Sequence, residues 1–123
     1  MGRREEALRL LEDKTKRQFG QEIRVYNNLG IIHKRSGNNE EAEASYLAAL
    51  DIDPESFFPN YNMGVLKAAT NAYPVALQYF NKSLELARAS QDEVYQINVH
   101  INIALVLERT GDLVGALSNM HLA

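Results

Sequence analysis

The sequence contains no cysteine, so disulfide bridges, thiolate metal sites and thiol nucleophiles are excluded. It also lacks a large charge excess, because 13 lysines and arginines oppose 16 aspartates and glutamates and leave a formal net charge of −3. Proteins that bind nucleic acid usually present a strongly basic surface, so we expect no nucleic-acid partner. With 46% hydrophobic and 24% charged residues, the chain has the composition of one folded domain.

Long hydrophobic runs are absent as well. No apolar segment approaches the roughly 18 residues that a membrane-spanning helix needs, so we expect no membrane insertion. Residues 1–6 are mostly charged and lack the apolar centre of a secretion signal. These absences predict a soluble, cytoplasmic protein.

The sequence does contain an internal repeat, because shifts of 34 and then 40 residues align it with itself. Each copy carries a small residue inside its first helix, an alanine in its second helix and a larger apolar residue one turn later. A glycine inside a helix costs about 1 kcal/mol relative to alanine, so its recurrence indicates the close approach of a second helix. The matched residues are Gly30, Gly64 and Ala104; Ala42, Ala76 and Ala116; and Tyr46, Phe80 and Met120. We expect a core built from Tyr26, Leu29, Ala42, Tyr46, Ala49, Leu50, Met63, Ala76, Phe80, Leu84, Ile103, Ala104 and Ala116.

This pattern resembles the tetratricopeptide repeat (TPR), a helix–turn–helix unit of 34 residues. In the first complete copy only His33 departs clearly, since the family usually has tyrosine there. The resemblance implies an all-α fold, a right-handed α-α superhelix in which antiparallel helix pairs stack as a solenoid. The residues that carry it are Tyr26, Leu29, Gly30, Gly37, Ala42, Tyr46, Ala49 and Pro54.

We expect seven helices, each bounded by turn or capping residues. Gly37 is predicted to end a helix, and Asn38 and Ser90 to begin capping boxes. The additional residues of the 40-residue step fall near 90–96 and should lengthen the helices on both sides by about one turn. The expected helices cover about residues 3–17, 22–35, 39–51, 57–70, 73–89, 92–109 and 112–123.

The whole chain, 1–123, is interpreted as one TPR array. The expected units are a half repeat at 1–21, a repeat at 23–56, a long repeat at 57–96 and an incomplete repeat at 97–123. Repeat arrays usually need polar terminal helices, and none is apparent here. We therefore expect the chain to be part of a longer protein, and its open repeat ends to favour self-association.

The sequence shows no catalytic, metal or cofactor motif. Its three histidines, His33, His100 and His121, lie in three different copies, and two of them occupy places where the repeat has core aromatic residues. We interpret them as packing residues, since no His-x-x-x-His pair or glycine-rich phosphate loop is present. The sequence therefore predicts a protein that is not an enzyme and that needs no cofactor.

The resemblance places the first helix of each pair along a concave groove. Asn28, Asn62 and Asn102 recur at one place in this groove, and an amide can both donate to and accept from the backbone of an extended peptide. Such a ladder is similar to that of the TPR region of sugar transferases. The candidate peptide-binding residues are Arg24, Asn27, Asn28, Phe58, Tyr61, Asn62, Val65, Asn98, Ile101, Asn102 and Leu105.

One subclass of the family is not expected. Chaperone-tail adaptors hold a terminal carboxylate with lysine and arginine side chains, whereas the matching places here carry Asn27, Ile31, Asn98 and Asn102. A neutral amide cannot supply the charge-assisted hydrogen bonds that such a clamp uses.

Together these features predict a non-catalytic scaffold for protein–protein interaction. Its expected partner is an extended peptide or a helix with two or three large apolar residues and acidic residues near Arg24, or an adjacent TPR unit. Two alternatives stay open: the substrate-recruiting TPR region of a larger enzyme such as a sugar transferase, and an architectural subunit of a large assembly.

Overall fold

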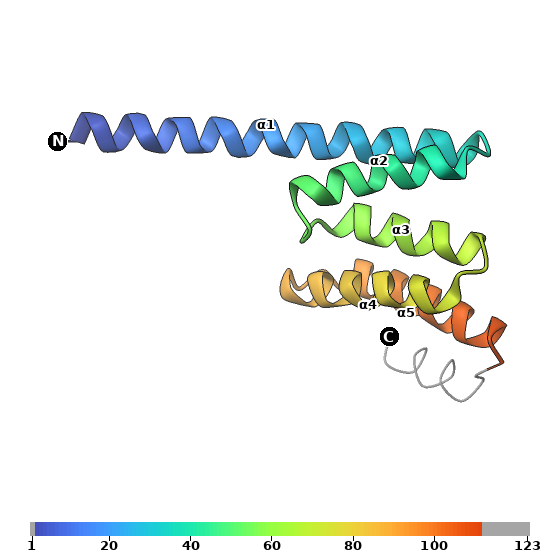
Figure 1. The fold of residues 1–123 in the computed structure, drawn as a ribbon. Helices are drawn as coiled ribbons and strands as arrows, with labels where there is room; N and C mark the ends of the chain where they lie inside the picture. The colour runs from blue at the N-terminus through green and yellow to red at the C-terminus, as the bar shows by residue number, and fades with distance from the viewer. Residues whose placement is uncertain (1, 112–123) are drawn as a thin grey trace.

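The computed structural model describes residues 2–111, and it arranges them as a stack of α-helices (Figure 1). Helices that follow one another in the sequence pack against one another in space, as antiparallel neighbours joined by short turns. The predicted all-α architecture of stacked helix pairs is confirmed. The five helices are α1 (Gly2–Arg35), α2 (Asn39–Ile52), α3 (Phe57–Ala69), α4 (Tyr73–Ala89) and α5 (Glu93–Arg109).

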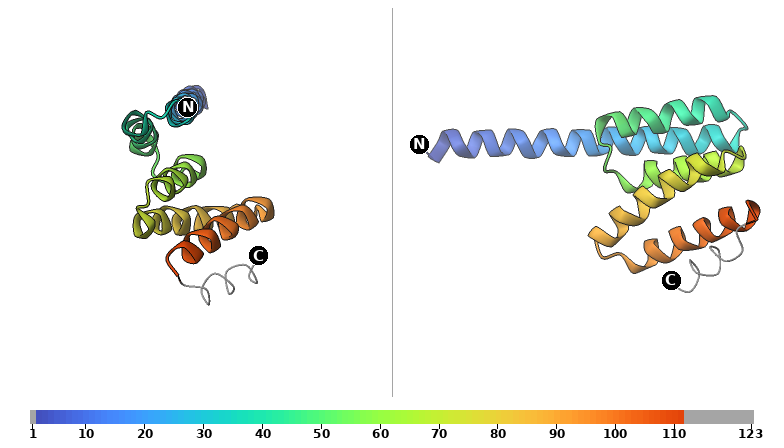
Figure 2. Two further views of the ribbon diagram at one scale, coloured as in Figure 1. Left: turned by 90° about the vertical axis from the view of Figure 1, so that its right-hand side faces the viewer. Right: turned by 60° about the horizontal axis from the view of Figure 1, so that its bottom comes forward.

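The first helix differs from the expectation, because α1 runs without interruption from Gly2 to Arg35. The separate helices predicted over residues 3–17 and 22–35 are therefore wrong. Residues 18–21 contain no proline and no serine, threonine, asparagine or aspartate to begin a new helix, and the single Gly20 costs only about 1 kcal/mol within a helix. Residues 2–21 are all exposed, and this half of α1 projects beyond the rest of the stack (Figure 2). The division of the chain into repeat units stays a prediction.

The turns explain where the helices end. Gly37 follows α1 with a positive φ of 80°, which confirms its predicted role at the end of that helix. The capping box expected at Ser90 is wrong, because Ser90 ends α4 and Asp92 caps α5 by accepting a hydrogen bond from the Tyr95 amide at 3.0 Å. Asn38 and Ser56 precede α2 and α3, but neither side chain makes a capping hydrogen bond.

The long repeat has the predicted effect on helix length. Helices α4 and α5 each contain 17 residues, whereas α2 contains 14 and α3 contains 13. The differences of three and four residues correspond to about one helical turn each. The helices on both sides of the turn near Ser90 are therefore longer, as expected.

Two clusters of buried side chains form the core. The first joins α2 to α3, and the second joins α4 to α5. Glycines allow the close approach, since a Cβ atom at Gly30 would overlap the Tyr46 ring and one at Gly64 would lie 2.6 Å from the Phe80 ring. The first cluster contains Ala42, Tyr46, Met63 and Leu66; the second contains Ala76, Phe80, Leu84, Val99, Ile103 and Val106.

Most of the predicted core is buried, with two clear exceptions. Tyr26 and Leu29 are 38% and 39% exposed, so the prediction that they lie in the core is wrong. Within residues 2–111 only α2 and α3 contact α1, and they leave this face uncovered, which is the physical reason for the exposure of both side chains. Leu50 is half-buried, and Ala116 lies outside the described residues.

The buried phenol of Tyr46 makes the stability of the fold depend on pH in the alkaline range. Burial raises the pKa of its phenol above the ordinary value of 10.0, and the charge of Arg35 lowers it to a smaller extent. The folded state therefore holds this proton more tightly than the unfolded state does. The resulting stabilisation is complete below the unfolded-state pKa and is lost as the pH rises through the higher folded-state pKa.

As the pH rises above 10.0, the ordinary pKa of tyrosine, we expect the stability of Tyr46→Phe to fall less than that of the native chain, because phenylalanine has no proton to release. Urea unfolding at a series of pH values measures this difference. Parallel stability curves for the two proteins across this range would contradict the role assigned to Tyr46.

Candidate peptide-binding groove

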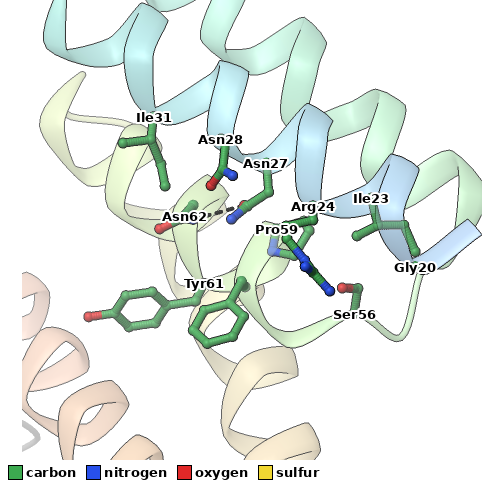
Figure 3. A pocket seen from close by; sticks show the side chains of 11 residues that line it. Gly20, Ile23, Arg24, Asn27, Asn28, Ile31, Ser56, Pro59, Tyr61 and Asn62 are labelled. Carbon is green, nitrogen blue, oxygen red and sulfur yellow. Dashed lines mark hydrogen bonds between the residues drawn. The ribbon is translucent and has the colours of Figure 1, made fainter. Parts of the chain in front are cut away.

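A pocket of about 620 Å³ lies between α1 and α3 (Figure 3). We call it the α1–α3 pocket. Its α1 residues recur every three or four positions, which places them on one face of that helix. Its other wall is formed by the start of α3 and the residue before it. The lining residues are Gly20, Ile23, Arg24, Asn27, Asn28, Ile31, Ser56, Phe58, Pro59, Tyr61 and Asn62.

Six of the eleven predicted peptide-binding residues line this pocket: Arg24, Asn27, Asn28, Phe58, Tyr61 and Asn62. Val65 lines an adjacent hollow of about 230 Å³, which shares Ile31 and Asn62 with the pocket. The other four predicted residues, Asn98, Ile101, Asn102 and Leu105, lie on α5 and line neither hollow.

The recurring asparagines join successive first helices of the stack. Asn62 Nδ2 donates a 2.9 Å hydrogen bond to Asn27 Oδ1, from α3 to α1 (Figure 3). One repeat later, Asn102 Nδ2 donates a 2.7 Å hydrogen bond to the Tyr61 hydroxyl, from α5 to α3. Asn102 Nδ2 also donates to the Asn98 carbonyl oxygen at 3.0 Å. The ladder thus has a structural role, and these bonds use Nδ2 of Asn62 and Asn102 and not their Oδ1 acceptors.

Aromatic rings of α3 and α5 contact one another beside the pocket. The Phe57 ring stacks on the Tyr95 ring with centroids 4.8 Å apart and on the Tyr61 ring with centroids 5.6 Å apart. The Phe58 ring meets Tyr95 edge to face at 5.3 Å and is 48% exposed. Ring contacts of this kind fix the side chains, so Phe58 presents a rigid apolar surface to the α1–α3 pocket.

Five residues that line the pocket are not among the predicted peptide-binding residues, namely Gly20, Ile23, Ile31, Ser56 and Pro59, and neither is Tyr95, whose ring contacts Phe58. Ile23 lies four residues before Asn27, and this helical spacing is the signal that identifies it. No such spacing in the sequence identifies Tyr95, because its contact with Phe58 depends on how α5 packs on α3.

The electrostatic character of the groove comes from three cations on α1. Arg24 is the charged residue among those lining the α1–α3 pocket, and Lys34 and Arg35 line the adjacent hollow. The residues lining these two hollows include no aspartate or glutamate. The groove therefore combines an apolar wall, amides and positive charge.

The described part of the chain offers two further findings that bear on function. Across residues 2–111, no three histidine, aspartate or glutamate side chains gather closely enough to hold a metal ion. The helices in that range also include none with the length and hydrophobicity required to cross a membrane.

Comparison with known proteins gives three results. Residues 23–56 match the tetratricopeptide repeat family. The N-terminal domain of stress-induced protein-1 from C. elegans has a similar structure, with a TM-score of 0.78 and 17% sequence identity over 84% of this chain and 82% of that domain. The sol locus transcriptional repressor of Clostridium acetobutylicum is 31% identical over 80 residues, which is 65% of this chain.

The chain spans about a quarter (25%) of the length of that repressor. The match over residues 23–56 covers residues 23–35 of α1, all of α2 and the turn that precedes α3. Residues 23–56 therefore match a tetratricopeptide repeat, and the chain has the fold of a tetratricopeptide-repeat domain.

Proposed function

We propose that this chain is a non-catalytic scaffold that binds a peptide segment of a partner protein in the groove between α1 and α3, in the cytoplasm. The TPR match and fold support a role in protein interaction. The observation that carries the proposal is the α1–α3 pocket, which places one cation, Arg24, among apolar and amide side chains. Concave sites with apolar walls and a few polar groups are typical binding sites.

The chemistry of the pocket indicates the chemistry of the ligand. Phe58 and Ile23 can bury a large apolar side chain, whereas Asn27 and Asn28 can pair with a peptide backbone. Arg24 can bind a carboxylate through a charge-assisted hydrogen bond. We infer that the bound segment carries two or three large apolar residues next to acidic residues.

A peptide array tests this proposal. Peptides that combine leucine or phenylalanine with glutamate should bind the purified chain, and versions with lysine in place of glutamate should not. For the tightest peptide, we expect Arg24→Glu to raise the Kd at least ~tenfold, because it replaces an attraction to an anion by a repulsion.

The variant Arg9→Glu is the matched control, since Arg9 also lies exposed on α1 but not in the α1–α3 pocket. It makes the same change in net charge, so a general electrostatic effect would weaken binding in both variants. Equal losses in the two variants, or no loss in Arg24→Glu, would contradict the proposed site.

A further inference from the structure

One apolar face of α1 is exposed, and we call it the bare face. The matching faces of α3 and α5 are covered by other helices. Val25, Leu29 and Ile32 are 57%, 39% and 57% exposed. The repeat shifts of 34 and 40 residues align Leu29 with Met63 and Ile103, and these two are 0% and 3% exposed. Ile32 aligns in the same way with Leu66 and Val106, which are 2% and 3% exposed.

The structure shows what covers this face in the other two cases, namely the helix that comes before. Ala42 and Tyr46 of α2 pack with Met63 and Leu66 of α3. Ala76 and Phe80 of α4 likewise pack with Ile103 and Val106 of α5, in the second core cluster. A helix of the same type is therefore the expected occupant of the bare face of α1.

The first half of α1 has the sequence of such a helix. Ala7 and Leu11 precede Ala42 and Tyr46 by 35 residues, so they match the residues with which α2 covers α3. Leu8 and Leu11 are 55% and 61% exposed. Because α1 is continuous, this segment points away from residues 22–35 of its own chain and cannot cover them (Figure 1).

We propose that a second copy of the chain covers this face. Two α1 helices lie antiparallel, and residues 3–17 of each copy pack on residues 22–35 of the other. Both copies thereby bury the same surfaces, so the assembly is a closed two-fold dimer that exchanges an identical element.

The apolar pattern along α1 fits this antiparallel arrangement. Leu8, Leu11, Val25, Leu29 and Ile32 lie on one face of the helix, and the polar residues Thr15, Gln18 and Glu22 lie on the middle of the same face. With the two-fold axis near residue 20, Leu8 lies level with Ile32 of the second copy and Leu11 with Leu29. These two layers, one at each end of the shared helix pair, are apolar on both sides, as the packing of antiparallel helices requires.

The charges of α1 also suit this arrangement. In the same register, Glu5 and Glu6 come level with Arg35 and Lys34 of the second copy. The basic residues 3–4 then lie just beyond the last turn of the second copy's helix, where the helix dipole favours cations. The bare face is distinct from the α1–α3 pocket, so the dimer and peptide binding do not compete for the same side chains.

Thiol cross-linking tests this dimer, because the chain has no cysteine of its own. We expect the double variant Leu8→Cys/Ile32→Cys, treated with a short bismaleimide, to yield covalent dimers on a denaturing gel. The double variant Leu10→Cys/Ile32→Cys is the matched control, since Leu10 is 61% exposed but lies outside the apolar face. It should yield few or no covalent dimers.

Sedimentation equilibrium gives an independent readout. Leu11→Lys should raise the dimer dissociation constant at least ~tenfold, since it removes one apolar contact from each end of the interface. Leu10→Lys adds the same charge at an equally exposed position and should leave the dimer unchanged. Circular dichroism should show the same helix content in both variants.

Three results would overturn the proposal. A cross-link between positions 8 and 32 within one monomer would show that residues 3–17 fold back on their own chain. A monomer with no cross-link would show that the face stays bare. A dimer that survives Leu11→Lys would show that the copies associate through another surface.

Discussion

The substitution Gly64→Leu should lower the free energy of unfolding by about 1–3 kcal/mol. A Cβ atom at Gly64 would lie 2.6 Å from Phe80 Cε1, which is closer than real Cβ atoms approach other heavy atoms. Phe80 is 0% exposed and belongs to the second core cluster, so its ring has no free volume into which it can move. Urea unfolding followed by circular dichroism measures the loss.

A second glycine supplies the control for this prediction. Gly20 also lies inside a helix, but a Cβ atom there would meet no heavy atom within 4 Å. We expect Gly20→Ala to raise the free energy of unfolding by up to about 1 kcal/mol, because alanine is the better helix former. An unfolding midpoint for Gly64→Leu equal to that of the native chain would contradict the packing described for α3 and α4.

These two glycines show why much of the fold is predictable from the sequence. Gly30 and Gly64 each face an aromatic ring of the paired helix, and both the glycine and the ring recur after 34 residues. A repeated contact leaves the same pair of residue types in each copy, so it can be found by aligning the sequence with itself. The buried Ala42, Tyr46 and Phe80 were predicted for this reason.

The first half of α1 was not predictable in the same way. Whether residues 18–21 form a turn or continue the helix depends on whether a hairpin gains more from packing than a straight helix does. The local sequence has one glycine and no proline, which gives a weak signal in either direction. Leu29 and Tyr26 carry the repeat pattern of core residues, but their burial requires a neighbouring helix that the described residues 2–111 do not supply.

The groove was predictable in part. Helical spacing relates Arg24, Asn27 and Asn28 to one another, and the repeat then relates them to Phe58, Tyr61 and Asn62. The hydrogen bonds between these side chains could not be predicted, because they depend on how far successive first helices are displaced along the stack. The asparagine ladder consequently has a contribution to stability that the sequence pattern does not reveal.

This dual role leads to an expected result for the variant Asn62→Ala/Asn102→Ala. The change removes the hydrogen bonds from Asn62 to Asn27 and from Asn102 to Tyr61. Each bond contributes about 1 kcal/mol, so the free energy of unfolding should fall by about 2 kcal/mol while the helices persist. If the amides also hold a peptide backbone, its binding should weaken by about 1–3 kcal/mol. Urea unfolding and fluorescence polarisation with the tightest peptide from the array measure the two effects separately.

Tyr61→Phe separates the two roles of the ladder. This variant lacks the hydroxyl that accepts a hydrogen bond from Asn102 Nδ2, so it loses the same bond between α3 and α5 as the double variant does. It keeps both asparagines. It should therefore lower stability by about 1 kcal/mol, and since the aromatic ring of residue 61 and both amides are kept, peptide affinity should fall less than in the double variant. Asn81→Ala, at an exposed position on α4, should change neither quantity. If the double variant binds the peptide as tightly as Tyr61→Phe does, the asparagine ladder serves only to hold successive repeats together.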